Sequence, residues 1–204
     1  MCGIAGELRY DDRLPDLGRL QTLAETLRRR GPDGSGLHAS GDIALAHRRL
    51  KIIDLSDAAR QPMVDAELGL SVVFNGCIYN HKEVRAELEA KGYRFFSNGD
   101  TEVIGKGYHC WGEDFVYKLN GMFAFAIAER DSGRLLLGRD RLGIKPLYYS
   151  EGPGFFRFAS ALPGLLAYDD IDRGLDAAAL NFYFSFHAVV PPPRTLIRGV
   201  RKLA

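Results

Sequence analysis

Several features that mark large classes of protein are missing from this sequence. Cysteine is scarce: Cys2, Cys77 and Cys110 are the three among 204 residues, and they are widely spaced. An odd, scattered set does not suit a disulfide framework, and no CxxC pair suggests a zinc site or a redox motif. We therefore expect no metal site, and a reducing, cytoplasmic compartment.

Neither an excess of one charge nor a long apolar run is present. Lys plus Arg number 27 against 26 Asp plus Glu, so the net charge is +1, and the composition offers no basic surface for nucleic acid. The longest uncharged apolar run, near residues 121–128, is much shorter than the roughly 20 residues of a transmembrane helix. No basic segment followed by an apolar one opens the chain. We expect neither a membrane segment nor a secretion signal.

The residues that are present suit one globular domain. Hydrophobic residues make up 46% of the chain and charged residues 26%, which is ordinary for a protein with a packed core. A chain of 204 residues is long enough to bury a substantial core. We find no repeat, low-complexity tract or linker, and so predict a single domain over residues 1–204.

The hydrophobic pattern predicts about eight strands and five helices. Strands are expected over 4–10, 43–47, 70–79 (interrupted by a turn at 75–76), 93–96, 121–129, 135–140, 148–149 and 155–159. Helices are expected over 14–30, 80–91, 100–112, 115–119 and 176–186. Because short turns join the strands, the pattern favours α+β with mostly antiparallel sheets. A loop with three glycines at 30–36 lacks the Lys-Ser/Thr and the apolar helix of a phosphate-binding loop.

Cys2 has a chemical property that depends on its position. If Met1 is removed, Cys2 carries both a thiol, with a pKa of about 8.5, and a free α-amine, with a pKa of about 7.7–8.0. The amine would then accept the thiol proton without a histidine partner. The alternative interpretation is that Cys2 is a small buried hydrophobic residue near a chain end.

Six motifs, in order along nearly the whole chain, resemble the glutaminase domain of class II glutamine amidotransferases. The Arg30-Gly31-Pro32-Asp33 sequence, together with the segment 139–149, is most similar to the asparagine synthetase branch. The motifs are Cys2-Gly3-Ile4-Ala5-Gly6, Arg30-Gly31-Pro32-Asp33-Gly34, His47-Arg48-Arg49-Leu50, Phe74-Asn75-Gly76-x-Ile78-Tyr79-Asn80, Asp100-Thr101-Glu102 and Gly121-Met122-Phe123-Ala124-Phe125.

The resemblance implies a fold and a reaction. The fold would be a four-layer αββα N-terminal-nucleophile hydrolase sandwich with two stacked, mostly antiparallel sheets. The reaction would be hydrolysis of L-glutamine to glutamate and ammonia, with no cofactor in this domain. ATP and Mg would be needed only in a C-terminal synthetase domain outside this chain, which would receive the ammonia. A homodimer is also compatible with the resemblance.

The resemblance also implies site residues. Cys2 would be the nucleophile, and the Asn75 side chain with the Gly76 N–H would form the oxyanion hole. An Asn-Gly pair flanked by strand residues is otherwise typical of a tight hairpin turn. Arg49 would bind the substrate carboxylate, because a guanidinium suits a bidentate carboxylate; the alternative is a solvated surface arginine.

Three further residues belong to the expected glutamine pocket. Asp100 would pair with the substrate ammonium, although its position also suits a helix N-cap. Leu50 and Ile52 would line the pocket largely through backbone groups. The α-amine of Cys2 would protonate the departing ammonia and then activate the water that hydrolyses a γ-glutamyl thioester.

One position departs from the family motif, in which a glutamate stands where this chain has Cys77. In a strand, Asn75 and Cys77 share a face, so the missing carboxylate would have been near the pocket. Losing a charge-assisted hydrogen bond costs roughly 1.5–3 kcal/mol, or about 10- to 150-fold in affinity. Either glutamine binds more weakly and Asp100 alone holds the ammonium, or a different acceptor and a reshaped pocket are used.

Other interpretations remain for comparison. A zinc site formed by the three cysteines is disfavoured, because they do not have the spacing of zinc ligands. A catalytic pair of His109 and Cys110 is disfavoured too, because adjacent residues on a helix point about 100° apart. Trp111, the Phe123/Phe125 pair and the run Tyr183-Phe184 are expected in the core. The parent protein would be an asparagine synthetase or, alternatively, an amidotransferase for a peptide-like acceptor. A non-catalytic glutamine-binding module is the hypothesis from another class, if Met1 is retained.

Overall fold

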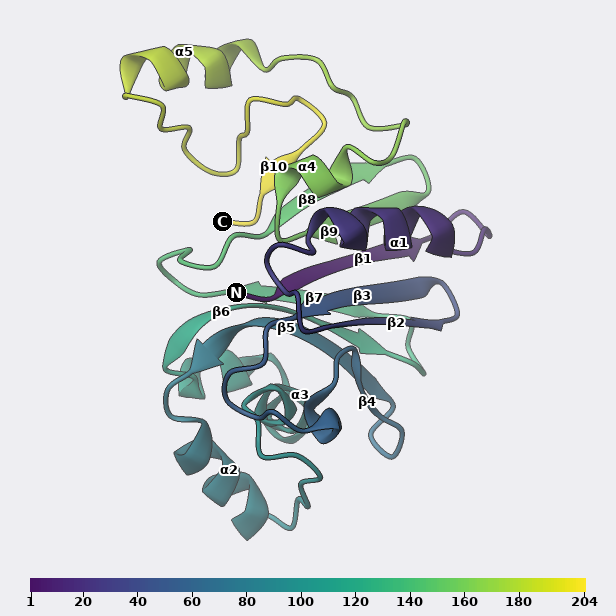
Figure 1. The fold of residues 1–204 in the computed structure, drawn as a ribbon, viewed down its shortest axis with the longest axis vertical. Helices are drawn as coiled ribbons and strands as arrows, with labels where there is room; N and C mark the ends of the chain where they lie inside the picture. Colours follow the sequence, from purple (N-terminus) through teal and green to yellow (C-terminus); the bar gives the residue numbers. More distant parts are fainter.

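Two antiparallel sheets lie face to face at the centre of the structure (Figure 1), a computed structural model that describes residues 1–204. The first sheet has the order β10 (Arg201–Lys202), β8 (Tyr148–Gly152), β9 (Phe155–Ala159), β1 (Gly3–Arg9), β3 (Ile43–Arg49) and β2 (Gly34–Ser40). The second sheet has the order β4 (Met63–Asp65), β5 (Leu70–Ile78), β6 (Gly121–Glu129) and β7 (Leu135–Arg139).

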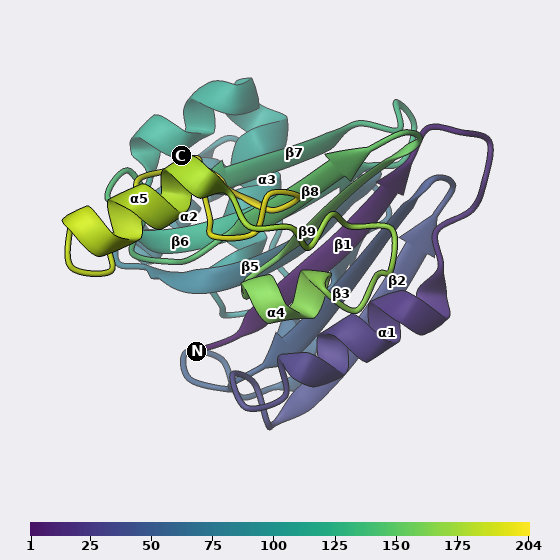
Figure 2. The same ribbon diagram turned by 90° about the horizontal axis from the view of Figure 1, so that it is seen from above.

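Helices cover the outer face of each sheet. On the first sheet, α1 (Leu17–Thr26) packs on β1 and β3, while α4 (Leu162–Leu165) packs on β8 and β9 and against α1 (Figure 2). On the second sheet, α3 (Thr101–Trp111) packs on β5, and α2 (His81–Ala90) packs against α3. The predicted α+β architecture of four layers is confirmed. None of the helices has the length and apolar character needed to span a bilayer.

Three shorter or more distant elements complete the chain. Two are 3₁₀ helices, η1 (Asp57–Ala59) and η2 (Gly112–Lys118). The third, α5 (Ala177–Ser185), lies farther out, beyond the first sheet (Figure 1). It begins as predicted at Asp176, whose carboxylate accepts a hydrogen bond from the Ala179 N–H. The prediction that Tyr183 and Phe184 belong to the core is wrong, since Phe184 is 76% exposed.

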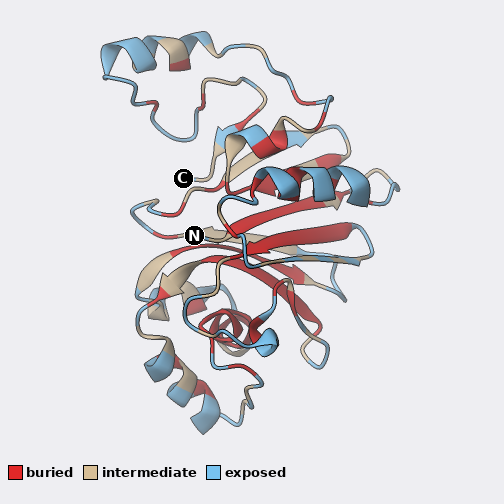
Figure 3. Ribbon diagram, in the orientation of Figure 1, coloured by how far each residue is buried: buried red, intermediate tan, exposed pale blue.

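β1 is buried on both faces, which fixes the position of the residues at its start. Its side chains alternate, as they must in a strand: Ile4 joins the apolar cluster between the sheets, and Ala5 joins the cluster beneath α1. The buried members of the cluster between the sheets are Ile4, Ile43, Leu45, Val73, Ala124, Ala126, Ala128, Leu147 and Phe158. Figure 3 shows this buried centre across both sheets. Cys2 is therefore attached to one of the most firmly packed strands.

The predicted turn at Asn75-Gly76 is wrong, because β5 runs without interruption through both residues. Its ladder with β6 extends from Leu70 opposite Glu129 to Ile78 opposite Gly121. A turn at Asn75-Gly76 would break the strand pairs from Asn75 to Ile78. Pairing with β6 therefore overrides the local preference of Asn-Gly for a turn. Glycine at 76 has a packing reason: a Cβ there would lie 2.4 Å from the Met122 carbonyl oxygen.

Other boundaries differ for local reasons. The first helix begins at Leu17 and not at 14, because the Asp16 carboxylate caps it by accepting from the Arg19 N–H. The predicted glycine loop at 30–36 instead leads into β2, an edge strand that the pattern missed because its residues are small and half exposed. The predicted strand at 93–96 is irregular, since the Phe96 N–H is satisfied by the Glu102 carboxylate and not by a neighbouring strand.

Glu7 of β1 is a charged residue that is fully buried. Its carboxylate accepts from Arg157 Nε at 3.0 Å and from the Asp16 N–H at 3.0 Å. Arg157 is buried too, and it also pairs with Asp170. A buried ion pair is costly to break from one side, because the remaining charge loses its partner.

Replacing Glu7 by Ala should therefore lower the free energy of unfolding by about 3–5 kcal/mol. The matched control is Glu113→Ala, which removes an exposed partner of Arg134 and should cost about 0–1 kcal/mol. Urea denaturation of both variants measures the two changes. Equal, small effects would show that Glu7 does not stabilise the interior.

Candidate active site

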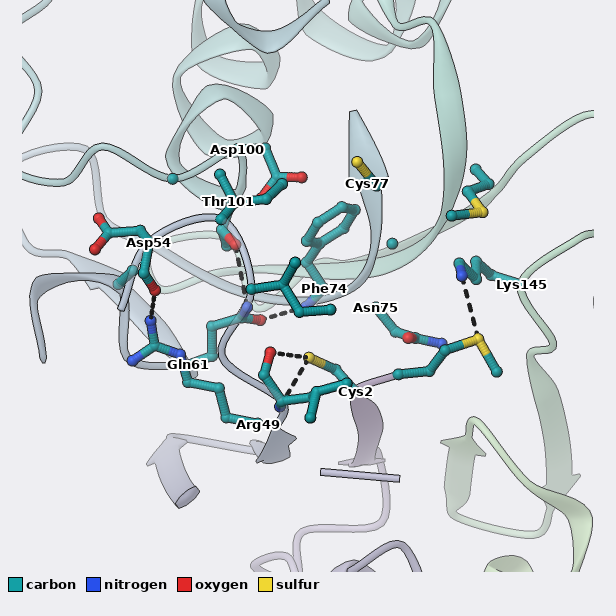
Figure 4. Close-up of a pocket in the computed structure, with 18 residues that line it drawn as sticks. Cys2, Arg49, Asp54, Gln61, Phe74, Asn75, Cys77, Asp100, Thr101 and Lys145 are labelled. Atoms are coloured by element: carbon teal, nitrogen blue, oxygen red, sulfur yellow. Dashed lines mark hydrogen bonds between the residues drawn. The ribbon is translucent and has the colours of Figure 1, made fainter. Parts of the chain in front are cut away.

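A cavity of about 260 Å³ opens beside the N-terminus, between the end of β3, the middle of β5 and the start of α3. All eight residues expected at the site line it, and they come from four separate parts of the sequence: Cys2, Arg49, Leu50, Ile52, Asn75, Gly76, Cys77 and Asp100. Figure 4 shows the thiol of Cys2 on one side of the cavity and Asp100 and Cys77 on the opposite side.

The Cys2 thiol is held by the backbone of Leu50. β1 and β3 pair with Gly3 opposite Arg48, which brings Leu50 beside Cys2. The Leu50 N–H donates to Sγ at 3.4 Å, and Sγ lies 3.7 Å from the Leu50 carbonyl. Burial raises the pKa of the Cys2 thiol, against the lowering effects of the Leu50 hydrogen bond and Arg49. The thiol is therefore mainly protonated at neutral pH and needs a base to become a nucleophile.

The Arg30-Gly31-Pro32-Asp33 motif holds the backbone of Cys2 and of the segment that follows β3. Arg30 Nε donates to the Cys2 carbonyl at 3.1 Å, and the Asp33 carboxylate accepts from the Lys51 N–H at 2.9 Å. Gly31 allows the contact, because a Cβ would lie 2.2 Å from the Arg48 carbonyl oxygen. The motif thus joins the end of β3 to the residue that carries the thiol.

β5 has an open edge where it passes the cavity. β4 pairs only with Leu70–Val72, so the later N–H groups on that side need other partners. The Phe74 N–H donates to Gln61 Oε1 at 2.6 Å, and the Ile78 N–H donates to Asp100 Oδ2 at 3.0 Å. Side chains thus replace the missing strand at these two positions.

Gly76 lies between them and its N–H has no such partner. Its register partner Phe123 makes its backbone hydrogen bonds with Asp140 instead, on the far side of β6. Gly76 is therefore a non-hydrogen-bonded pair with Phe123, and its N–H faces the open edge. Because Gly76 lines the cavity, this N–H is available to a ligand.

The Asn75 side chain is the second unsatisfied group. It is 1% exposed, and neither its Nδ2 nor its Oδ1 has a hydrogen-bond partner. A buried amide without partners costs free energy, and such an exception calls for an explanation. The cavity supplies one, since Asn75 lines it: a polar group of a bound ligand would satisfy the amide.

Arg49 and Asp100 place opposite charges in the same cavity. Arg49, 7% exposed, donates to the Ser56 carbonyl at 2.9 Å and to the Asp54 carbonyl at 2.5 Å, and no carboxylate pairs with it. Asp100 is 6% exposed, and burial raises the pKa of its carboxyl group, while the hydrogen bond from Ile78 lowers it. Arg49 is thus not a surface residue, and Asp100 makes no N-cap hydrogen bond to α3.

Cys77 lies across the cavity from the Cys2 thiol, and Lys145 lines the cavity beside Met1 (Figure 4). Cys77 is half-buried and lines the cavity with Asn75, as expected for residues two apart in a strand. Burial raises the pKa of the Cys77 thiol, as does Asp100, whereas Lys145 lowers it. Lys145 is buried, and its Nζ lies 3.2 Å from Met1 Sδ.

Several contributors to the site were not singled out from the sequence. Gln61 and Asp54 line the cavity from a loop whose composition carried no signal. His47 stood in a motif without an assigned role; its Nε2 lies 3.2 Å from the Phe74 carbonyl, and its Nδ1 has no partner. No group of three His, Cys, Asp or Glu side chains is placed to hold a metal ion.

Comparison with known proteins gives consistent matches over the whole chain. A family model described as "Glutamine amidotransferase domain" matches residues 1–204. Asparagine synthetase [glutamine-hydrolyzing] 3 of Bacillus subtilis is 34% identical over 100% of this chain and 33% of its own length. Asparagine synthetase [glutamine-hydrolyzing] 1 of the same organism is 40% identical over 100% of this chain and 32% of its own length. The chain thus spans about a third of the length of these relatives.

Solved structures show the fold. The glutamine phosphoribosylpyrophosphate amidotransferase of B. subtilis, complexed with ADP and GMP, aligns with a TM-score of 0.70 at 19% identity, over 81% of this chain and 43% of that one. A second structure, described as the allosteric regulatory enzyme of purine biosynthesis, aligns with a TM-score of 0.67 at 18% identity, over 81% of this chain and 43% of that one. The predicted N-terminal-nucleophile hydrolase sandwich is confirmed.

His47 should make stability depend on pH. Burial lowers the pKa of the ring to about 3, whereas an unfolded chain binds the proton near pH 6.5. The unfolded state therefore binds more protons between these values, and the free energy of unfolding falls by up to about 1.4 kcal/mol per pH unit as pH falls from about 6.5 to about 3.

Urea denaturation at several pH values measures this contribution. His47→Gln, which does not titrate, should show a shallower loss of stability in that range than the wild type. His38→Gln, a control at a half-buried position on edge strand β2, should keep the wild-type slope. Parallel curves for the wild type and His47→Gln would contradict the assignment.

Proposed function

The chain belongs to the family of glutamine amidotransferase domains, and from this premise we propose that it hydrolyses L-glutamine to L-glutamate and ammonia at Cys2. The observation that carries the proposal is the cavity itself, where a thiol, an unsatisfied amide, a free N–H, a guanidinium and a carboxylate meet. We further propose that the ammonia passes to an ATP-dependent synthetase domain like that of the longer relatives, with asparagine synthesis as the leading assignment.

Glutamine has a carboxylate, an ammonium and a side-chain amide, and the cavity offers a counterpart for each. Each terminal nitrogen of Arg49 uses one N–H on a carbonyl and keeps a second for the substrate carboxylate. Asp100 uses Oδ2 on the Ile78 N–H, which leaves Oδ1 for the ammonium. Leu50 and Ile52 border the same space and would contribute backbone groups.

The reaction would begin once Met1 is removed. The freed α-amine of Cys2 takes the thiol proton, and the thiolate attacks the side-chain amide carbon of glutamine. Negative charge that forms on the amide oxygen is met by Asn75 Nδ2 and the Gly76 N–H. Loss of one such donor typically lowers kcat by about 10²–10³. Asn75 Nδ2 has no other partner to leave first, and the register of β5 with β6 leaves the Gly76 N–H unpaired as well.

The second half of the reaction uses the same amine. It donates the proton to the departing ammonia, which leaves a γ-glutamyl thioester on Cys2. The amine then accepts a proton from water as the water attacks the thioester, and glutamate is released with the thiol restored. Since burial raises the pKa of this thiol, the neighbouring amine with its pKa of about 7.7–8.0 is a necessary base.

Cys2→Ala should abolish glutamate release, because it removes the nucleophile and leaves the binding groups in place. Cys110→Ala is the matched control, since Cys110 lies on α3 outside the cavity, and it should retain wild-type turnover. Both are assayed on protein with a defined N-terminus, checked by intact mass. A preparation in which Met1 is retained throughout and no glutamate is released would support the non-catalytic glutamine-binding module instead.

Cys77 separates two forms of the proposal. If glutamine is simply bound more weakly here, Cys77→Glu should lower KM by about 10- to 150-fold, because a charge-assisted hydrogen bond to the ammonium is restored. Cys77→Gln, with the same length and no charge, is the control and should change KM much less. An unchanged or raised KM for Cys77→Glu would favour the reshaped pocket, with a peptide-like acceptor for the ammonia.

A further inference from the structure

His47 joins the two sheets at the candidate active site. It belongs to β3, where it stands opposite Ile4 of β1, two residues from Cys2. Its ring crosses to the second sheet, and Nε2 lies 3.2 Å from the Phe74 carbonyl of β5. The contact thereby connects β3, the strand that pairs with β1 next to Cys2, to the residue that precedes Asn75.

The donor in this hydrogen bond can be assigned from chemistry. A carbonyl oxygen only accepts, so Nε2 must carry the proton, and Nδ1 is the bare nitrogen that has no partner. The ring is 1% exposed, and burial lowers its pKa to about 3. His47 is therefore a neutral donor throughout the range in which a Cys2 amine would act as a base, and it carries out no proton transfer itself.

The contact controls one peptide plane at the site. The Phe74 carbonyl and the Asn75 N–H belong to the same planar peptide unit. A hydrogen bond that fixes the carbonyl therefore also fixes the backbone orientation at Asn75, and with it the direction in which the Asn75 side chain points. The preceding peptide is held at the same open edge of β5, where the Phe74 N–H donates to Gln61 Oε1 at 2.6 Å. Gln61 in turn donates to Thr101 Oγ1 at 3.1 Å, at the start of α3.

A polar ring at this position is not needed for packing. Leu45, two residues earlier on the same face of β3, fills the space between the sheets with an apolar side chain. His47 instead leaves one nitrogen buried without a partner, which costs free energy. Its hydrogen bond to Phe74 is what distinguishes it from a leucine there.

We propose that His47 is a positioning residue: its Nε2–H holds the Phe74 carbonyl and thereby sets the Asn75 amide and the Gly76 N–H at the correct separation from the Cys2 thiol. The inference rests on the proposed glutaminase reaction and deepens it. His47 is absent from the residues that line the cavity, so it acts through β5 and not on the substrate.

This role affects turnover more than binding. Arg49 is held by the Ser56 and Asp54 carbonyls, and Asp100 by the Ile78 N–H; neither anchor involves His47. The groups proposed to bind the two ends of glutamine therefore stay in place when His47 is replaced. Only the donors that meet the transition state are displaced.

The test compares His47→Leu, which removes the donor, with His47→Gln, whose amide N–H can reach the same carbonyl. His47→Leu should lower kcat for glutamate release by about 10- to 100-fold, with KM for glutamine within about twofold. His47→Gln should recover most of the loss. Leu45→Val is the matched control, since it removes one methylene from the same face without removing a hydrogen bond, and its kcat should stay near the wild-type value.

Two readouts separate positioning from loss of fold. The rate of Cys2 alkylation by iodoacetamide should be similar in all four proteins, because the thiol and its Leu50 contacts are unchanged. The side-chain amide signals of Asn75 in ¹H–¹⁵N spectra should shift in His47→Leu and return toward the wild-type position in His47→Gln.

The outcomes divide cleanly. Wild-type kcat in His47→Leu, an equal loss in His47→Gln, or an equal loss in Leu45→Val would overturn the inference. If the wild type with Cys2 at its N-terminus releases no glutamate, the proposed function fails. The Asn75 signals then decide the positioning role alone: signals unchanged in His47→Leu would overturn it, and a shift reversed in His47→Gln would support it.

Discussion

The face-to-face packing of β1 against β5 is the constraint on which the rest of the site depends. Ile4 and Val73 belong to one apolar cluster between the sheets, and each stands two residues from a group with proposed chemistry, Cys2 and Asn75. Close packing of interiors leaves little freedom for such strands to shift. The hydrophobic core therefore does more than stabilise the fold: it sets how far the thiol lies from the groups that would stabilise the transition state.

The second feature of the site is that some polar groups are satisfied by the protein and others are left free. Along the open edge of β5, side chains accept from the Phe74 and Ile78 N–H groups, whereas the Gly76 N–H and the Asn75 amide remain without partners. Free donors in a buried cavity destabilise the empty protein. The same donors cost no reorganisation when charge develops beside them. The unpaired groups thus lower the stability of the empty protein, and a bound ligand that pairs with them would restore it.

The sequence motifs brought together residues that share a cavity, whereas several secondary-structure predictions were wrong. All eight residues expected at the site line one cavity, and the chemical role of each stays a prediction. The prediction of a turn at Asn75-Gly76 failed because a local preference was weighed without knowledge of β6, which pairs with both residues. β2 was missed for a related reason: small residues at a sheet edge have no strong pattern. Contacts such as His47 with Phe74 join residues 27 positions apart, and no spacing rule reveals them.

The central claim is that a glutamyl group is transferred to Cys2 while Asn75 and Gly76 face the oxyanion, and acid quenching tests it most directly. Protein beginning at Cys2 is mixed with glutamine, quenched in acid within one turnover and analysed by peptide mass spectrometry. The account predicts a γ-glutamyl adduct on the N-terminal peptide, with its level reduced in Asn75→Ala. Ammonia release with no adduct on Cys2, or an adduct on Cys77 or Cys110 instead, would contradict it.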